Sequence, residues 1–174
     1  MNIAVTGVPS GEKVSSFLNA PGKMLIGGKF VAAESGKTFS VFDPATAGQI
    51  ASVAAGDKAD VNNAVAAARK AFERGPWPRM KPQDRARLLF KLADAIEAHG
   101  DELALLETLD NGKPLRVART VDIPASAEKF RYYAGWVTKL AGKTTEISLP
   151  GDWHAYTLRE PVGVAGLIVP WNFP

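Results

Sequence analysis

The uncharged run VGVAGLIV at positions 162–169 constrains the fold of this chain more than any other stretch. It does not alternate between apolar and polar residues, which is typical of a strand buried on both faces of a parallel sheet. Such a strand predicts an α/β fold. The run ends at Pro170, and a loop is predicted from there to position 174.

This loop lies where open α/β sheets bind their ligands, beyond the carboxyl ends of the strands. Two interpretations of Asn172 are open. An Asn between a Trp and a Phe-Pro pair is a common turn residue. In the other interpretation, its side-chain amide N–H points at an oxygen that becomes negative during a reaction. One such donor supplies about 3 kcal/mol of transition-state stabilisation.

The segment EPVGVAGLIVPWNFP resembles the hallmark segment of the NAD(P)-dependent aldehyde dehydrogenases. Three further blocks resemble the same family in the same order: GDKADVNNAVAAARKAFERGPWPRM, LETLDNGKP and FRYYAGWVTKLAGKT. The resemblance covers the chain from about position 24 onward. It implies the amino-terminal portion of an aldehyde-dehydrogenase-like fold, and an enzyme that oxidises an aldehyde to a carboxylic acid with NAD or NADP. Members acting on phenylacetaldehyde or betaine aldehyde are the most similar in character.

The resemblance also assigns roles to residues around the loop. It implies that Asn172 donates to the developing oxyanion of a thiohemiacetal, and that Ile168, Val169, Pro170 and Trp171 line the nicotinamide cofactor. The family's nucleophile is a cysteine, and this sequence contains none. The thiol, the water-activating glutamate and the residues that grip the cofactor ribose are therefore expected outside these 174 residues. The chain alone is expected to be inactive.

The same comparison divides the chain into four parts. Residues 1–22 are expected to form an arm, loose apart from one short helical turn near positions 14–18. Residues 23–142 form the amino-terminal part of the cofactor-binding domain. Residues 143–160 form an oligomerisation hairpin, and residues 161–174 form the first strand and the PWN loop of a Rossmann-like sheet.

Turn residues predict two antiparallel hairpins before position 56. Gly27 and Gly28 separate two short apolar runs, and adjacent glycines are typical of a tight hairpin turn because its backbone needs positive φ angles. Asp43 and Pro44 mark the turn of the second hairpin.

Apolar periodicity predicts helices over residues 56–75, 81–98, 101–110 and 113–141. Asp57 and Asp60 suit the amino-terminal end of the first helix. Pro124 predicts a kink, or a junction of two helices, in the last one. The expected buried face of the second helix consists of Leu88, Leu89, Leu92 and Ile96. The aromatic residues at positions 130–136 have helical spacing, which favours packing in the core.

Residues 143–160 read as a hairpin with one apolar side and a turn at positions 150–152. A hairpin outside a sheet is marginally stable alone, so it must lie on the body or on a second subunit. The resemblance implies an oligomerisation arm of a homodimer or homotetramer. An alternative function follows, in which the chain is a catalytically inactive module that binds a protein partner.

Nothing indicates nucleic-acid binding or a membrane span. The formal net charge is +3, and Lys and Arg are scattered among acidic residues rather than gathered in a block. No apolar run reaches the ~20 residues of a membrane-crossing helix. The first residues do not have the pattern of a secretory signal, so a cytoplasmic location is expected.

No metal site is predicted. His99 and His154 are far apart and have no neighbours at ligand spacing. Asp110 is either a turn residue at a helix end or, as the resemblance suggests, a ligand of a structural monovalent cation. Glu107 is expected to be solvated or paired with a cation.

Overall fold

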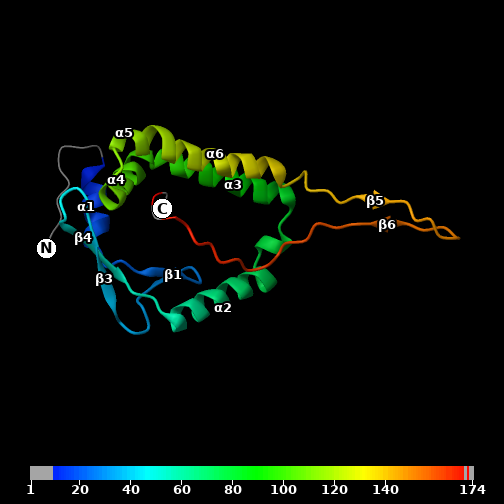
Figure 1. Cartoon of the computed structure of the whole chain (residues 1–174), viewed down its shortest axis with the longest axis horizontal. Coiled ribbons are helices and arrows are strands. Elements are labelled where there is room, and N and C mark those ends of the chain that lie inside the picture. The colour runs from blue at the N-terminus through cyan, green and yellow to red at the C-terminus, as the bar shows by residue number, and fades with distance from the viewer. Residues whose placement is uncertain (1–9, 171, 173–174) are drawn as a thin grey trace.

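The structure is a computed structural model that describes residues 10–170 and 172. A short helix is followed by two antiparallel hairpins, then by a run of helices, and then by a third hairpin (Figure 1). The helices are α1 (Gly11–Asn19), α2 (Lys58–Arg74), α3 (Pro82–Ala98), α4 (Gly100–Asn111), α5 (Leu115–Val117) and α6 (Ile123–Trp136). The strands are β1 (Met24–Ile26), β2 (Lys29–Val31), β3 (Thr38–Phe42), β4 (Gln49–Ala54), β5 (Thr144–Thr145) and β6 (Ala155–Tyr156).

Both amino-terminal hairpins form as predicted. In the first, Met24 pairs with Val31, and Gly27 and Gly28 turn the chain with φ angles of 60° and 78°. These angles lie in the left-handed region, which glycine enters without steric cost. In the second, β3 pairs with β4, and the Asp43 carboxylate accepts hydrogen bonds from Ala45 N and Thr46 Oγ1, both at 2.8 Å. This local bonding sets the turn that the sequence predicts.

The predicted cap of α2 also forms. The Asp57 carboxylate accepts from Ala59 N at 2.9 Å, and the Asp60 carboxylate accepts from Asp57 N at 2.9 Å. Asp60 is buried and accepts a further bond from Glu34 N at 3.0 Å. These bonds satisfy amides that a helix leaves free at its start. They also fix the start of α2 against the loop that follows β2.

The helical turn predicted near positions 14–18 forms as part of a longer helix, α1, but the prediction that this region is loose is wrong. Val14 is completely buried, and Leu18 lies one turn further along the helix and packs in the same cluster as Leu105 of α4. Side chains four residues apart lie on one face of a helix, so this pair attaches α1 to α4. Residues 1–9 lie outside the described part of the chain.

Helices α3 and α6 pack together along one side of the molecule (Figure 1). Apart from Ile123, which packs with Ala104 and Ala118, the buried residues of these two helices are small: Ala93 on α3, and Ala127 and Ala134 on α6. The prediction that Leu88 and Leu92 are buried is wrong, because each is 42% exposed. Alanines let two helix backbones approach closely, whereas the leucine face of α3 is left without a complete cover by the described residues.

Core packing of the aromatic residues at positions 130–136 is also contradicted. Phe130, Tyr132, Tyr133 and Trp136 are all exposed, and Ala134 is the buried residue of this segment. Tyr132 and Tyr133 contact each other edge to face, with ring centroids 5.2 Å apart. Helical spacing indicated that these residues share a surface, but it did not tell whether the chain covers that surface.

Arg131 connects α6 to α3 beside this aromatic surface. Its guanidinium lies 2.9 Å from the Asp94 carboxylate and 2.7 Å from the Glu97 carboxylate, and it also contacts Glu128 at 3.1 Å. The hydrogen bond from Arg131 holds the pKa of the Glu97 carboxyl below its ordinary value. Because the carboxylates are exposed, the network orients the two helices more than it stabilises them.

Pro124 lies at the predicted helix junction. A π-helical turn spans Ala118–Asp122 between α5 and α6. Pro124 has no N–H to donate to the carbonyl of Thr120, four residues earlier, and the wider turn accommodates this missing bond. The π-helical turn is therefore explained by Pro124, the residue from which the sequence predicted a kink or a helix junction.

The predicted parallel strand at residues 162–169 does not form. The described residues make three two-stranded sheets, each antiparallel, and none includes this segment. A parallel strand bonds to neighbours along its edges, and in this part of the chain no other strand lies beside it. The segment keeps the composition of a buried strand and adopts an unpaired, exposed conformation.

Candidate functional site

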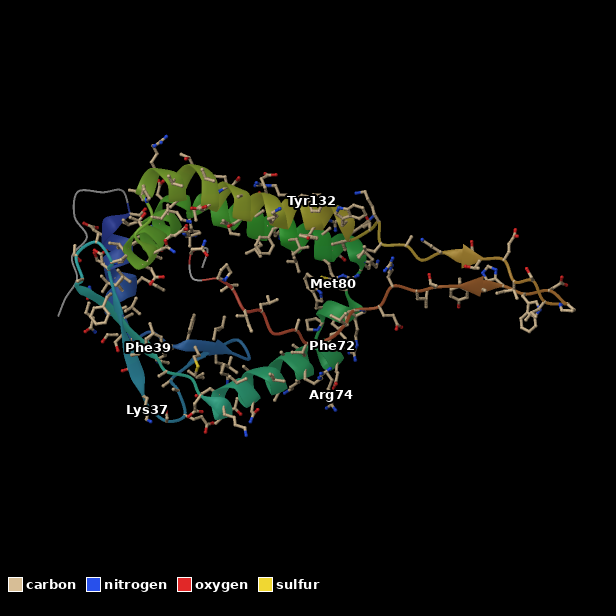
Figure 2. The ribbon with its side chains drawn as sticks, in the orientation of Figure 1. Lys37, Phe39, Phe72, Arg74, Met80 and Tyr132 are labelled. Atoms are coloured by element: carbon tan, nitrogen blue, oxygen red, sulfur yellow. The ribbon has the colours of Figure 1, made fainter. Side chains whose placement is uncertain are left out.

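The segment that carries the predicted site follows the hairpin of β5 and β6. In the view of Figure 1 it runs back between α2 and the α3–α6 pair, toward α1 and α4. Near its start, Gly163 has a φ of +102°. A Cβ added there would lie 3.5 Å from Arg69 Nη1 and 4.0 Å from Phe72 Cε1, both on α2. Figure 2 shows Phe72 near the base of the hairpin. Gly163 therefore turns the segment beside α2 in a conformation that other residues rarely adopt.

The structure exposes the residues predicted to line the cofactor. Ile168 is 100% exposed and Val169 65% exposed, and Pro170 is exposed as well. Trp171 lies outside the described residues. Asn172 is exposed and lies in a turn. These residues share one short stretch of chain, in which the apolar side chains come first and the amide donor follows them.

An apolar hollow of about 370 Å³ lies close to α1 and α4. Its apolar lining includes Phe17, Leu18, Leu103 and Leu106, and its polar lining includes Glu107 and Asp110. Asp110 is exposed in the last turn of α4. Among the described residues, no group of three or more His, Cys, Asp or Glu side chains is placed to hold a metal ion. The helix-end interpretation of Asp110 fits this position.

Glu107 is held in an ion cluster that sequence reasoning did not find. Lys113 Nζ lies 2.7 Å from Glu107 Oε1 and 2.8 Å from Asp122 Oδ2. The three side chains are only 11–14% exposed. Hydrogen bonds to Asp122 and then to Glu107 raise the pKa of Lys113. Glu107 is thus ion-paired, one of the two alternatives that the sequence left open. The three residues come from α4, the loop after it and the π-helical turn, so no local spacing reveals the cluster.

The model of the aldehyde dehydrogenase family matches residues 30–174. The chain belongs to the aldehyde dehydrogenase family. It is 53% identical over 152 residues to the mitochondrial aldehyde dehydrogenase family 2 member B4 of Arabidopsis thaliana, an alignment that covers 87% of this chain and 28% of that protein. It is 50% identical to phenylacetaldehyde dehydrogenase of Pseudomonas fluorescens, over 90% of this chain and 32% of the relative.

Solved aldehyde dehydrogenases share the fold. A variant of the Bacillus cereus enzyme superposes with a TM-score of 0.92 at 53% identity, over 97% of this chain and 34% of that structure. The chain therefore spans about a third of the length of the aldehyde dehydrogenases that it matches, and these matches confirm the predicted fold class. None of the described helices is long and apolar enough to cross a bilayer. The cytoplasmic location stays a prediction, because some of the relatives are named as mitochondrial.

The ion cluster makes a testable contribution to stability. Replacing Lys113 by Met leaves the carboxylates of Glu107 and Asp122 close together with little water and without their shared cation. We expect K113M to lower the melting temperature several times more than R87M, which removes the exposed Arg87–Asp84 pair. Exposed pairs contribute little, whereas breaking a largely buried one is costly. Equal melting temperatures for the two variants would contradict a stabilising role.

The pH dependence of this difference has a defined sign. Because the pKa of Lys113 is raised in the folded protein, the folded state holds the proton more tightly than the unfolded state does. The stabilisation is complete below about pH 10.4, the ordinary lysine value, and is lost as the pH rises through the folded pKa. The gap between wild type and K113M should therefore be constant near neutrality and should narrow in strongly alkaline buffer.

Proposed function

We propose that this chain forms the amino-terminal part of an enzyme that oxidises an aldehyde to a carboxylic acid with NAD or NADP. Within it, the Asn172 side-chain amide donates a hydrogen bond to the oxygen of the reacting carbonyl. The observation that carries the proposal is the position of Asn172, exposed in a turn directly after an uncharged segment that matches the family. The solved relatives include a complex of the Bacillus cereus enzyme with NAD+, at 50% identity and a TM-score of 0.84.

The chemistry of an aldehyde explains why an amide donor is needed. When a nucleophile attacks the carbonyl carbon, negative charge develops on the oxygen. A fixed N–H near that oxygen stabilises the charged transition state more than the neutral aldehyde, and this difference lowers the barrier. The Asn172 amide carries two N–H donors and no charge. The attacking thiolate belongs to a cysteine, which these 174 residues do not contain.

The residues before Asn172 fit a wall for the cofactor. Ile168 and Val169 present exposed apolar side chains, and a flat nicotinamide ring offers an apolar face of matching character. When bound, NAD or NADP supplies the acceptor for the hydride that leaves the substrate carbon. The residues of this chain would hold the ring beside the donor and exclude water from it. The role of Trp171 stays a prediction, since that residue lies outside the described part of the chain.

The relatives favour an aromatic aldehyde as substrate. One is named benzaldehyde dehydrogenase, from Antirrhinum majus, at 53% identity, and another phenylacetaldehyde dehydrogenase, at 50%. The block at positions 130–144 resembles enzymes for aryl or amine-derived aldehydes, a range that includes this class. We therefore place aryl aldehydes first among the substrates to test.

Two substitutions at Asn172 separate a donor from a turn residue. In a chimera, these 174 residues replace the matching third of the Bacillus cereus enzyme. We expect N172A to lower kcat by about 100- to 1,000-fold, because an oxyanion donor is lost. Asp is as suitable as Asn in turns, but an ionised Asp has no N–H to donate. N172D should therefore be at least as impaired as N172A. If N172D retains the activity of the chimera, the donor role is wrong.

The purified chain should not turn over substrate by itself. The proposed reaction requires a thiolate, and none is present. We expect no aldehyde-dependent rise in absorbance of reduced cofactor with benzaldehyde, phenylacetaldehyde or betaine aldehyde, with either NAD or NADP. The unmodified Bacillus cereus enzyme serves as the positive control. Turnover by the purified 174-residue chain would contradict the proposed division of the catalytic residues.

The hairpin of β5 and β6 supports a second function, self-association. It projects from the body of the molecule (Figure 1), and its ladder joins only Thr144 to Tyr156 and Thr145 to Ala155. Tyr156 is 60% exposed and Leu158 is 71% exposed. Such a short ladder is marginal in water, so contact with a second copy would stabilise it. The assembly proposed is a homodimer or homotetramer.

Sedimentation equilibrium tests this contact. We expect the chain to self-associate, and the double substitution of Tyr156 and Leu158 by Glu to weaken association by at least about tenfold, since charged groups are costly to bury in an apolar contact. F39E is the matched control, because Phe39 is 55% exposed and lies on β3 at the other end of the molecule (Figure 2). A monomeric wild type, or equal association of both variants, would exclude the hairpin as the contact.

A further inference from the structure

Positive charge is concentrated in the part of the chain that joins α2 to α3. Residues 69–91 contain eight Lys or Arg residues and two acidic residues. This excess of six positive charges is twice the formal net charge of the whole chain, which is +3. The acidic residues that balance the chain therefore lie in other elements, and this stretch carries a local positive potential.

Both acidic residues of this stretch are already paired with basic neighbours. Glu73 lies 3.9 Å from Arg69, and Asp84 lies 2.7 Å from Arg87. Four further cations are exposed and have no ion pair or side-chain hydrogen bond with the described part of the chain: Lys70, Arg74, Arg79 and Lys81. These four, which we call the basic surface, keep their charge available for an anionic partner.

A short 3₁₀ helix, η1 (Trp77–Arg79), presents an aromatic side chain within the basic surface. Met80 N donates to Trp77 O at 3.2 Å, and Arg85 Nη1 reaches from α3 to Met80 O at 2.8 Å, so the turn is fixed from both sides. Trp77 is 45% exposed. Figure 2 shows Arg74 at the end of α2, on the outer side of the molecule. An exposed indole therefore lies in the turn that separates two pairs of cations along the chain.

We propose that the basic surface and Trp77 bind reversibly to the surface of an anionic lipid bilayer. Lys and Arg side chains are attracted by the negative potential of anionic headgroups. Trp favours the boundary between headgroups and acyl chains, where its ring is in an apolar environment and its N–H stays hydrated. The two features occur together here, and no bilayer-crossing helix is required, because the contact is made by a turn and the helix ends beside it.

The aromatic content of the surface favours a bilayer over a nucleic acid. Proteins that bind single strands stack successive bases on several aromatic side chains along a groove. Within residues 69–81, Trp77 is the one exposed aromatic residue. Its neighbours Pro76 and Pro78 are exposed as well, and they carry no hydrogen-bond donor for a base edge. A single apolar tip surrounded by cations suits shallow insertion among lipid headgroups better than base recognition.

Vesicle co-sedimentation tests the proposal directly. We expect the chain to bind vesicles of phosphatidylcholine with about 30% phosphatidylserine at least tenfold more tightly than vesicles of phosphatidylcholine alone. The difference should disappear in about 0.5 M salt, because screening shortens the reach of the charges. No binding to the anionic vesicles would overturn the proposal. Equal binding to both kinds of vesicle would also overturn it, because it would indicate nonspecific adsorption of apolar side chains.

Matched charge reversals locate the contact. Arg79 and Lys81 are exposed, so R79E/K81E should leave the melting temperature within a few degrees of wild type while it weakens binding to the anionic vesicles at least about tenfold. K37E/K129E is the control, because it changes the net charge equally at exposed lysines outside the basic surface. Lys37 lies at the far end of the molecule from Arg74 (Figure 2). Equal losses in the two variants would overturn the proposal, because they would show an effect of net charge alone.

A second pair of variants tests the indole, and DNA tests the other class of anion. W77A should weaken binding to the anionic vesicles several-fold, whereas W153A should not, because Trp153 is 62% exposed but lies in the hairpin of β5 and β6. Equal binding of the two variants would contradict insertion of Trp77. A single-stranded DNA oligonucleotide is titrated in parallel. DNA binding that R79E/K81E abolishes, without binding to anionic vesicles, would overturn the proposal and assign the basic surface to nucleic acid.

Discussion

The need of an extended backbone for hydrogen-bonding partners governs this structure. A helix satisfies its own amides and carbonyls, so α2, α3 and α6 form from local sequence. A strand depends on another strand, and hairpins obtain theirs within a few residues along the chain. Residues 162–169 have a composition suited to a central parallel strand, which requires neighbours from distant parts of a chain. Among the described residues these neighbours are absent, and the segment stays open.

The same dependence explains where the core is and where it is missing. Val14, Leu18 and Leu105 bury one another because α1 and α4 are both present. Ala93 and Ala127 are buried because α3 and α6 pack closely. The leucine face of α3 and the exposed valines of α2 have no such cover. The chain therefore combines a well-packed core at α1 and α4 with apolar surfaces suited to covering by another segment.

Interactions between residues that are close in the sequence could be predicted, and contacts between distant elements could not. Gly27–Gly28, the Asp57–Asp60 cap and the break at Pro124 act within a few residues, and the predictions made from them are confirmed. Burial of Leu88, Leu92 and the aromatic residues of α6 was predicted wrongly, because periodicity identifies an apolar face without showing what covers it. The Lys113 cluster joins three elements whose approach depends on the fold. The family was recognisable because four separate blocks match it, whereas the role of Asn172 depends on a surrounding site that one segment cannot define.

The role of Asn172 depends on what surrounds its side-chain amide. An amide donor lowers a barrier when it is fixed in place and water does not compete for the same oxygen. Asn172 is exposed in this chain, and in water an N–H gains little by bonding to a carbonyl rather than to solvent. Covering the segment would exclude water, lower the local dielectric and strengthen the bond to a developing negative charge. The exposure of Asn172 and that of residues 162–169 therefore have one structural origin, because both belong to a segment that has no strand beside it in the described part of the chain.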